Sequence, residues 1–294
     1  MNALNTLVHL GPLNGGVLAT FLVLVLGAVA VSLHRVHRGE PVPVLPLTVV
    51  LLLPLLFSTW ASTWQYDHAL TYTVDVPNPE KQRFIADMLS RVLATQVWSG
   101  AIAALGAVGL LGGSLALTVR GERPRWLLGG IATALGLGLV MVATVSLGAH
   151  PALLTAVRVG GYGLAAAISV WALIAAHRKG PGRQLATLVA LALPLAVAGL
   201  DVMTVGGLAI EQFVVVARLP VAEKQEALRA ALAVLDGLQS SAWVGLVAAS
   251  GVSLCGALLT RRGQQLATFA SLAAVLLASV AGVATSTAWA LAFY

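Results

Sequence analysis

The chain has 294 residues, of which 59% are hydrophobic and 10% are charged, and its formal net charge is +6. With a mean hydropathy of +0.92, it has too little polar surface to cover a soluble fold, so a bilayer must solvate most of its side chains. This composition excludes an ordinary soluble domain. The basic residues lie in short loops between apolar runs, so membrane orientation explains the charge and nucleic-acid binding is not expected.

Eight apolar runs are long enough to cross a hydrocarbon core of about 30 Å as helices. In chain order they are expected at residues 14–33, 44–64, 97–119, 126–148, 159–176, 185–207, 241–260 and 266–288. The loops after the first, third, fifth and seventh runs are rich in Arg and hold only Glu40 and Glu122 as acids. The positive-inside rule makes those loops cytoplasmic. We therefore expect a multi-pass protein of the bacterial inner membrane with both termini on the periplasmic side.

Two landmarks in the sequence recur at one offset. Residues 77–82 read PNPEKQ and residues 220–225, which lie 143 positions later, read PVAEKQ. The dipeptide His34-Arg35 recurs as His177-Arg178 at the same offset. A shared offset for separated landmarks predicts a tandem duplication.

Between the second and third runs of each copy lies a segment with helical periodicity. Its apolar stripes are Phe84, Met88, Leu89, Val92 and Leu93 in the first copy, and Leu228, Leu232, Leu235 and Leu238 in the second. We expect an all-α membrane protein of eight transmembrane helices in two parallel four-helix repeats, residues 1–150 and 151–294. Each repeat is expected to carry a short outer amphipathic helix.

Asp201 lies inside the sixth apolar run, about five residues or roughly 7.5 Å from its centre. A carboxylate at this depth costs about 2.5 to 3.5 kcal/mol on insertion scales, so its presence needs a compensating role. One interpretation is a protonatable relay site with Thr204 one turn further on. The other is a hydrogen-bonded tie between helices, to Thr144, to Ser146 or to a partner subunit.

The second copy also carries a family resemblance. Residues 200–217 read LDVMTVGGLAIEQFVVVA and are followed by PVAEKQEALRAALAVL and DGLQSSAWVGLVAASG. These segments resemble the second and third transmembrane helices of the MotA/TolQ/ExbB proton-channel family. Phe213 stands at the aromatic position of the family pattern, Asp236 at the acid, and Ser240 and Ser241 at the paired hydroxyls. The resemblance implies that these hydroxyls line a proton passage completed by a partner helix that bears an aspartate.

The transport interpretation makes the chain a stator-like subunit that uses proton flow to drive a partner protein. Its proton-path candidates are Asp201, Thr204, Asp236, Ser240 and Ser241. The expected partners are membrane lipids and other membrane subunits, among them a single-span protein with an intramembrane aspartate. The alternatives are a non-conducting anchoring subunit of a larger membrane complex and a secondary transporter built on parallel repeats.

Catalysis and cofactor binding are not expected from the sequence. Cys255 is the single cysteine, so a disulfide within the chain and a paired-cysteine metal motif are both excluded. The sequence contains no phosphate-binding loop, nucleophile elbow or zinc-binding helix motif. We therefore predict neither an enzyme nor a bound metal or cofactor.

Overall fold

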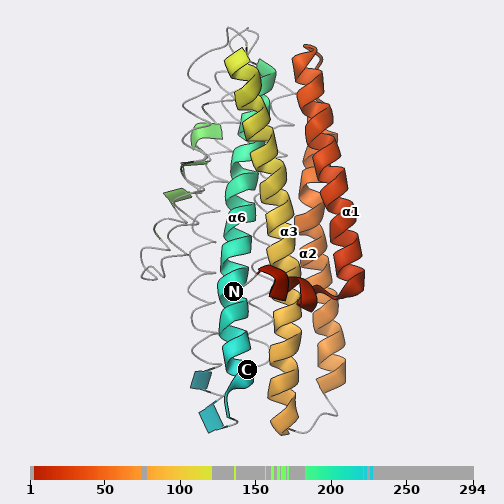
Figure 1. Ribbon diagram of the computed structural model, residues 1–294, viewed down its shortest axis with the longest axis vertical. Helices are drawn as coiled ribbons and strands as arrows, with labels where there is room; N and C mark the ends of the chain where they lie inside the picture. The colour runs from red at the N-terminus through yellow and green to blue at the C-terminus, as the bar shows by residue number, and fades with distance from the viewer. Residues whose placement is uncertain are drawn as a thin grey trace.

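The computed structural model describes residues 3–73, 78–120 and 183–220, with scattered residues between 136 and 171 and between 222 and 227. Four long helices account for nearly all of this part of the chain, which contains no β-strand: α1 (Ala3–His37), α2 (Val44–Thr73), α3 (Asn78–Arg120) and α6 (Arg183–Arg218). They stand side by side in an elongated bundle (Figure 1). The all-helical class expected from the sequence is confirmed for these residues.

Four of the predicted apolar runs coincide with the described helices. The runs at 14–33, 44–64, 97–119 and 185–207 lie within α1, α2, α3 and α6, in that order. Two stretches, Leu10–His37 and Arg91–Leu117, are long and apolar enough to cross a membrane by length and composition. The coarse prediction of membrane-spanning helices therefore has support from α1 and α3.

The other predictions about architecture fall on parts of the chain that the structure does not describe. Runs 241–260 and 266–288 lie outside the described residues, and only Gly136 of run 126–148 and scattered residues of run 159–176 are described. The boundary between the two repeats, at residue 150, also lies outside them. The eight-helix count and the duplication therefore stay predictions.

The outer amphipathic segment of the first copy differs from the prediction. Helix α3 is continuous from Asn78 to Arg120, so the stripe from Phe84 to Leu93 is its first half and not a separate short helix. Between Glu80 and Gly100 the sequence has neither Gly nor Pro to end the helix. The corresponding stripe of the second copy lies outside the described residues.

Helix α1 is broken near its beginning, which the sequence analysis did not predict. Gly11 has φ 71° and ψ 160°, outside the helical region, and Pro12 follows it. Positive φ is readily adopted by Gly, and Pro is well suited to the first position of a helix, where its missing N–H is not needed. The short helix before Gly11 lies across the bundle, whereas the part after it runs along the bundle axis (Figure 1).

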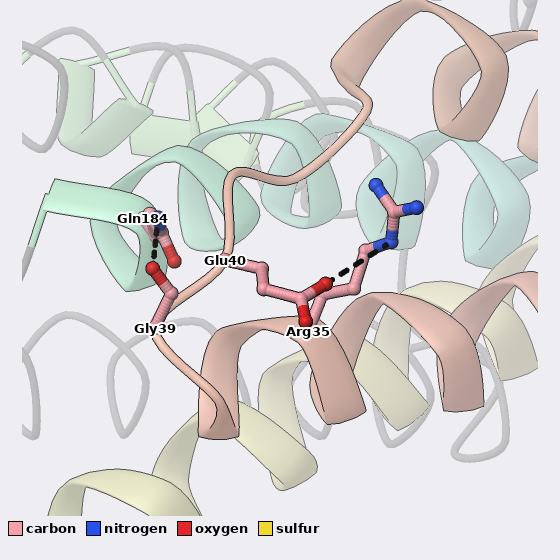
Figure 2. A network of polar contacts seen from close by, with 4 residues as sticks. All are labelled: Arg35, Gly39, Glu40 and Gln184. Carbon is pink, nitrogen blue, oxygen red and sulfur yellow. Dashed lines mark hydrogen bonds and ion pairs between the residues drawn. The ribbon is translucent and has the colours of Figure 1, made fainter.

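A tight cap ends α1 at the other end of the bundle, which we call the loop end because the α1–α2 loop lies there. The amide of Glu40 donates to the carbonyl of Arg35 (2.9 Å), and the amide of Gly39 donates to that of Val36 (3.1 Å). Gly39 has φ 75°, so this is a Schellman cap. The Gln184 side chain of α6 donates to the Gly39 carbonyl at 3.5 Å, joining this loop to the start of α6 (Figure 2).

Helix α3 holds the described bundle together, because it packs against α1, α2 and α6. Gly106, Gly109 and Gly113 of α3 lie beside Val25, Val29 and Leu33 of α1 in that order, so these two helices run parallel. Helices α2 and α6 run in the opposite direction (Figure 1). In chain order, α1, α2 and α3 therefore alternate in direction, as expected for consecutive membrane crossings.

Helices α3 and α6 meet backbone to backbone at Gly100 and Gly199. A Cβ atom placed on Gly199 would lie 2.7 Å from the Gly100 carbonyl oxygen and 2.7 Å from the Ala104 backbone nitrogen. Ala103 and Ala107 continue this small-residue surface on α3 and are both fully buried. Small residues at such positions let helix backbones come close enough for extensive van der Waals contact, which is the main source of helix association in membranes.

Helices α1 and α6 have opposite surroundings. On α1, large apolar side chains point outward, with Leu13 74% and Val23 70% exposed. On α6, every described side chain from Leu185 to Val197 is buried except the half-buried Thr187. A helix that is buried all round is a central helix of the protein. The outward apolar face of α1 is of the kind that lipid would cover.

Candidate functional site

Asp201 is fully buried in α6, with an exposed fraction of 0%. The neighbouring Val202 is also buried, and Leu200 and Met203 are half-buried. A charged side chain is almost never fully buried without a structural or functional reason. The structure adds one fact to the sequence prediction: the carboxyl group of Asp201 faces the protein interior and not the surface of the bundle.

Asp201 lies on the side of α6 that is turned away from α3. Gly199, Val202 and Met203 form the face that meets Gly100 of α3. Successive helix residues are rotated by about 100°, so Asp201 is about 200° around the helix from Gly199. Its side chain is therefore buried among parts of the protein other than the α3 contact.

The contacts of α3 also give the depth of each residue along the bundle. Gly106 of α3 lies beside Leu51 of α2, and the two helices are antiparallel. Counting seven residues forward from Leu51 reaches Ser58. Counting seven residues back from Gly106 reaches Ser99, which is therefore level with Ser58. Gly100 lies between Gly199 and Met203 of antiparallel α6, which places Asp201 level with Gly100 by the same counting. Ser58, Ser99 and Asp201 therefore lie at similar depth, to within about one helix turn.

Further buried polar side chains lie about one turn away, toward the end of the bundle opposite the loop end, where α2 ends and α3 begins. The amide of Asn14 donates to the Thr95 hydroxyl at 3.2 Å, and this hydroxyl donates to the Arg91 carbonyl at 3.1 Å. Gln96 is 4% exposed and sits beside Thr95 in the sequence. We call the whole group the polar layer; its members are Asn14, Ser58, Thr95, Gln96, Ser99 and Asp201.

Beyond the polar layer, the four helices have an apolar core. Among their described buried side chains, the remaining polar ones are Ser32 and Ser114, near the loop end. Ser99 and Ser114 are separated by fifteen positions of α3, or about 20 Å. The core between them is formed by side chains such as Val29, Leu51 and Leu110. Polar groups are therefore concentrated in one half of the bundle.

The structure places only part of the site predicted from the sequence. Asp201 lies in the polar layer, and Thr204 follows one turn later in α6, although its side chain is not among those described. Asp236, Ser240 and Ser241 lie outside the described residues. Whether these five residues meet at one place is therefore not tested, and their shared role stays a prediction.

Sequence reasoning missed Ser58, Ser99 and the Asn14–Thr95 pair as members of a site. Each lies in or beside an apolar run, where an isolated Ser, Thr or Asn carries little signal. Their grouping depends on which residues of different helices share one depth, and composition does not contain that information. Among the described residues, no group of three or more His, Cys, Asp and Glu side chains could hold a metal ion.

No protein-family model, curated protein or solved structure matches this chain. The function must therefore be argued from the polar layer, from the apolar core beside it and from the sequence.

Proposed function

We propose that the chain is a membrane subunit that binds and passes on protons at Asp201, in the manner of the MotA/TolQ/ExbB proton channels that its second half resembles. The observation that carries this proposal is the complete burial of Asp201 on a central helix whose preceding four turns are apolar apart from Thr187. Ionisable residues in such positions are costly, and in membrane proteins they commonly mark ion pathways and proton relays.

The position of the polar layer supports uptake from the outer side. The loop end carries Arg35 and Arg38, so the positive-inside rule assigns it to the cytoplasm. The polar layer lies in the opposite half of the bundle and is therefore nearer the outer surface. A proton would enter from that side, and Thr204, Ser240 and Ser241 are the proposed hydroxyls beside its path.

The apolar half of the bundle supports a role for a partner. About 20 Å of apolar core separates Ser99 from Ser114 in the described helices. A proton cannot cross such a region without polar groups or water, so other segments or another protein must provide the inner part of the path. A single-span partner that bears an intramembrane aspartate would supply an acidic group at the required depth.

A non-conducting anchor is the second candidate, and the α3–α6 contact favours it. Two helices whose backbones meet at Gly100 and Gly199 form a rigid unit suited to holding other subunits in place. In this role Asp201 would be a polar tie between helices, and its replacement would alter assembly and not proton flux.

The deciding experiment uses the complex isolated from native membranes in mild detergent. Its mass and composition show whether a single-span protein with an intramembrane aspartate accompanies the chain. The complex is then placed in lipid vesicles, and proton entry is followed with a pH-sensitive dye. We expect the native complex to conduct and the Asp201→Asn variant, which keeps the side-chain shape but not the acid, to lose conduction while its assembly is unchanged.

The matched control is Ser114→Ala, which alters a buried polar side chain in the other half of the bundle and should leave proton entry unchanged. The double variant Ser240→Ala, Ser241→Ala should lose conduction as Asp201→Asn does. Equal proton entry in the native and Asp201→Asn complexes would refute the proposal, and so would a native complex that does not conduct. Altered assembly in Asp201→Asn would then support the anchor.

A further inference from the structure

One exposed stripe of helix α1 changes from apolar to basic as it reaches the loop end. Residues three or four positions apart lie on one face of a helix, and this spacing joins five exposed residues, which we call the α1 stripe: Val23, Gly27, Ala30, His34 and Arg38. The amide of Arg38 donates to the carbonyl of His34 at 3.1 Å, so Arg38 continues the last turn of α1. About three turns of apolar surface therefore lead directly to a histidine and an arginine.

The apolar part of the α1 stripe has open space at Gly27. A Cβ atom placed there would meet nothing within 4 Å. Large exposed side chains stand one turn before and one turn after this glycine, since Val23 is 70% exposed and Val31 is 55% exposed. A small residue between large ones leaves room for a flexible hydrocarbon chain, which gains van der Waals contact with the side chains around it.

The loop end carries an excess of positive charge. Four arginines lie there by their positions at the ends of three helices: Arg35, Arg38, Arg120 and Arg183. Glu40 is the only acid at this end among the described residues. Its carboxylate lies 3.9 Å from the Nε atom of Arg35 and partly neutralises that side chain (Figure 2). Within the described ranges Arg38 has no ion pair, so its guanidinium group offers its donors to a ligand.

The charge of the α1 stripe favours a lipid over a second copy of the chain. Two copies have the same orientation in a membrane, so contact between their α1 stripes would bring both Arg38 side chains to one end. Like charges at close range repel. An anionic lipid has the complementary arrangement, because its phosphate lies at the depth of the arginine and its acyl chains lie beside the apolar turns.

We propose that the α1 stripe binds an anionic phospholipid, whose phosphate accepts hydrogen bonds from Arg38 and one of whose acyl chains lies over Gly27. A guanidinium group suits this role because its fixed fork of N–H donors matches the geometry of a phosphate. The last carbonyls of a helix repel an anion. Here those of Arg35 and Val36 already accept from the amides of Glu40 and Gly39, which reduces the repulsion.

The test titrates the purified full chain in detergent with phosphatidylglycerol and with phosphatidylcholine of the same acyl chains, and native mass spectrometry counts the bound lipid. We expect the anionic lipid to bind more tightly. Arg38→Gln should lower its affinity about fivefold and leave that of phosphatidylcholine unchanged, because it removes one basic residue at the membrane surface. Arg38→Lys should keep most of the affinity. Glu40→Gln should raise it, since this change releases Arg35 from its acidic neighbour.

Two further variants complete the test. Arg91→Gln removes an exposed arginine from the opposite half of the bundle and should leave the affinity for phosphatidylglycerol unchanged. Gly27→Leu fills the open space on the α1 stripe and should lower the affinity for phosphatidylglycerol several-fold. Its matched control is Gly112→Leu, at an exposed glycine of α3 where a Cβ also meets nothing within 4 Å. Circular dichroism confirms that both leucine variants keep their helices.

Three results would overturn the proposal. The first is equal binding of the two lipids, and the second is an unchanged affinity for phosphatidylglycerol in Arg38→Gln. The third is an affinity that Gly27→Leu leaves unchanged, as expected if the arginine attracts any free anion. A native dimer that Gly27→Leu separates would assign the stripe to a second copy and would also overturn it. None of these measurements depends on proton conduction, so the outcome is separate from that of the proposed function.

Discussion

Replacing Gly199 with alanine tests the close contact between α3 and α6. The added Cβ would lie 2.7 Å from both the Gly100 carbonyl oxygen and the Ala104 nitrogen, and 3.1 Å from the Ala104 Cα. These are backbone atoms, so no change of rotamer can relieve the clash and the helices must separate. A separation of about 0.5 to 1 Å forfeits a quarter to a half of the attraction between the atoms in contact. Overpacking of this kind typically costs about 1 to 3 kcal/mol.

We therefore expect Gly199→Ala to lower the free energy of unfolding by about 1 to 3 kcal/mol, although alanine is the better helix former. The assay is denaturant unfolding in detergent, followed by circular dichroism. Gly207→Ala is the matched control, because Gly207 lies on the same helix and a Cβ there would meet nothing within 4 Å. It should raise the free energy of unfolding by up to about 1 kcal/mol. If Gly199→Ala proved as stable as this control, the reasoning about backbone contact would be refuted.

Two further predictions use the same unfolding assay. Gly39→Ala should lower the free energy of unfolding by about 1 to 2 kcal/mol, because φ 75° is strained for a residue with a Cβ; Gly112→Ala, at a position with open space and no positive φ, should not. Asn14→Ala should cost about 1 kcal/mol through the lost hydrogen bond to Thr95, and Thr95→Val should add little once Asn14 is gone. A full additional cost for Thr95→Val would show that the pair is not coupled.

The sequence was sufficient to predict the helical class and the places of four helices. Apolar runs of about 20 residues leave few options, because in lipid every backbone polar group must be satisfied within the chain and a helix does so locally. The ends of the helices were less predictable. The continuation of α3 through residues 78–96 depends on a stretch without Gly or Pro, and the break in α1 depends on the backbone of Gly11, which Gly permits but does not require.

The candidate site was predictable only in part. Asp201 could be found from the sequence because one acid in an apolar run is conspicuous on its own. Ser58 and Ser99 could not be found, since an isolated serine in a helix is ordinary until its neighbours on other helices are known. Their similar depth to Asp201 follows from where Leu51 and Gly199 touch α3.

By itself, the sequence determined that the chain forms long apolar helices and that one of them carries a carboxyl group where it is costly. These properties depend on residues close together in the chain, through helix geometry and the transfer of side chains out of water. Only the tertiary structure decided that Asp201 lies on a central helix and not against lipid, and that it lies at similar depth to two buried serines. Those facts depend on the contacts through which separate helices settle beside one another, and here the close approach at Gly100 and Gly199 sets the register.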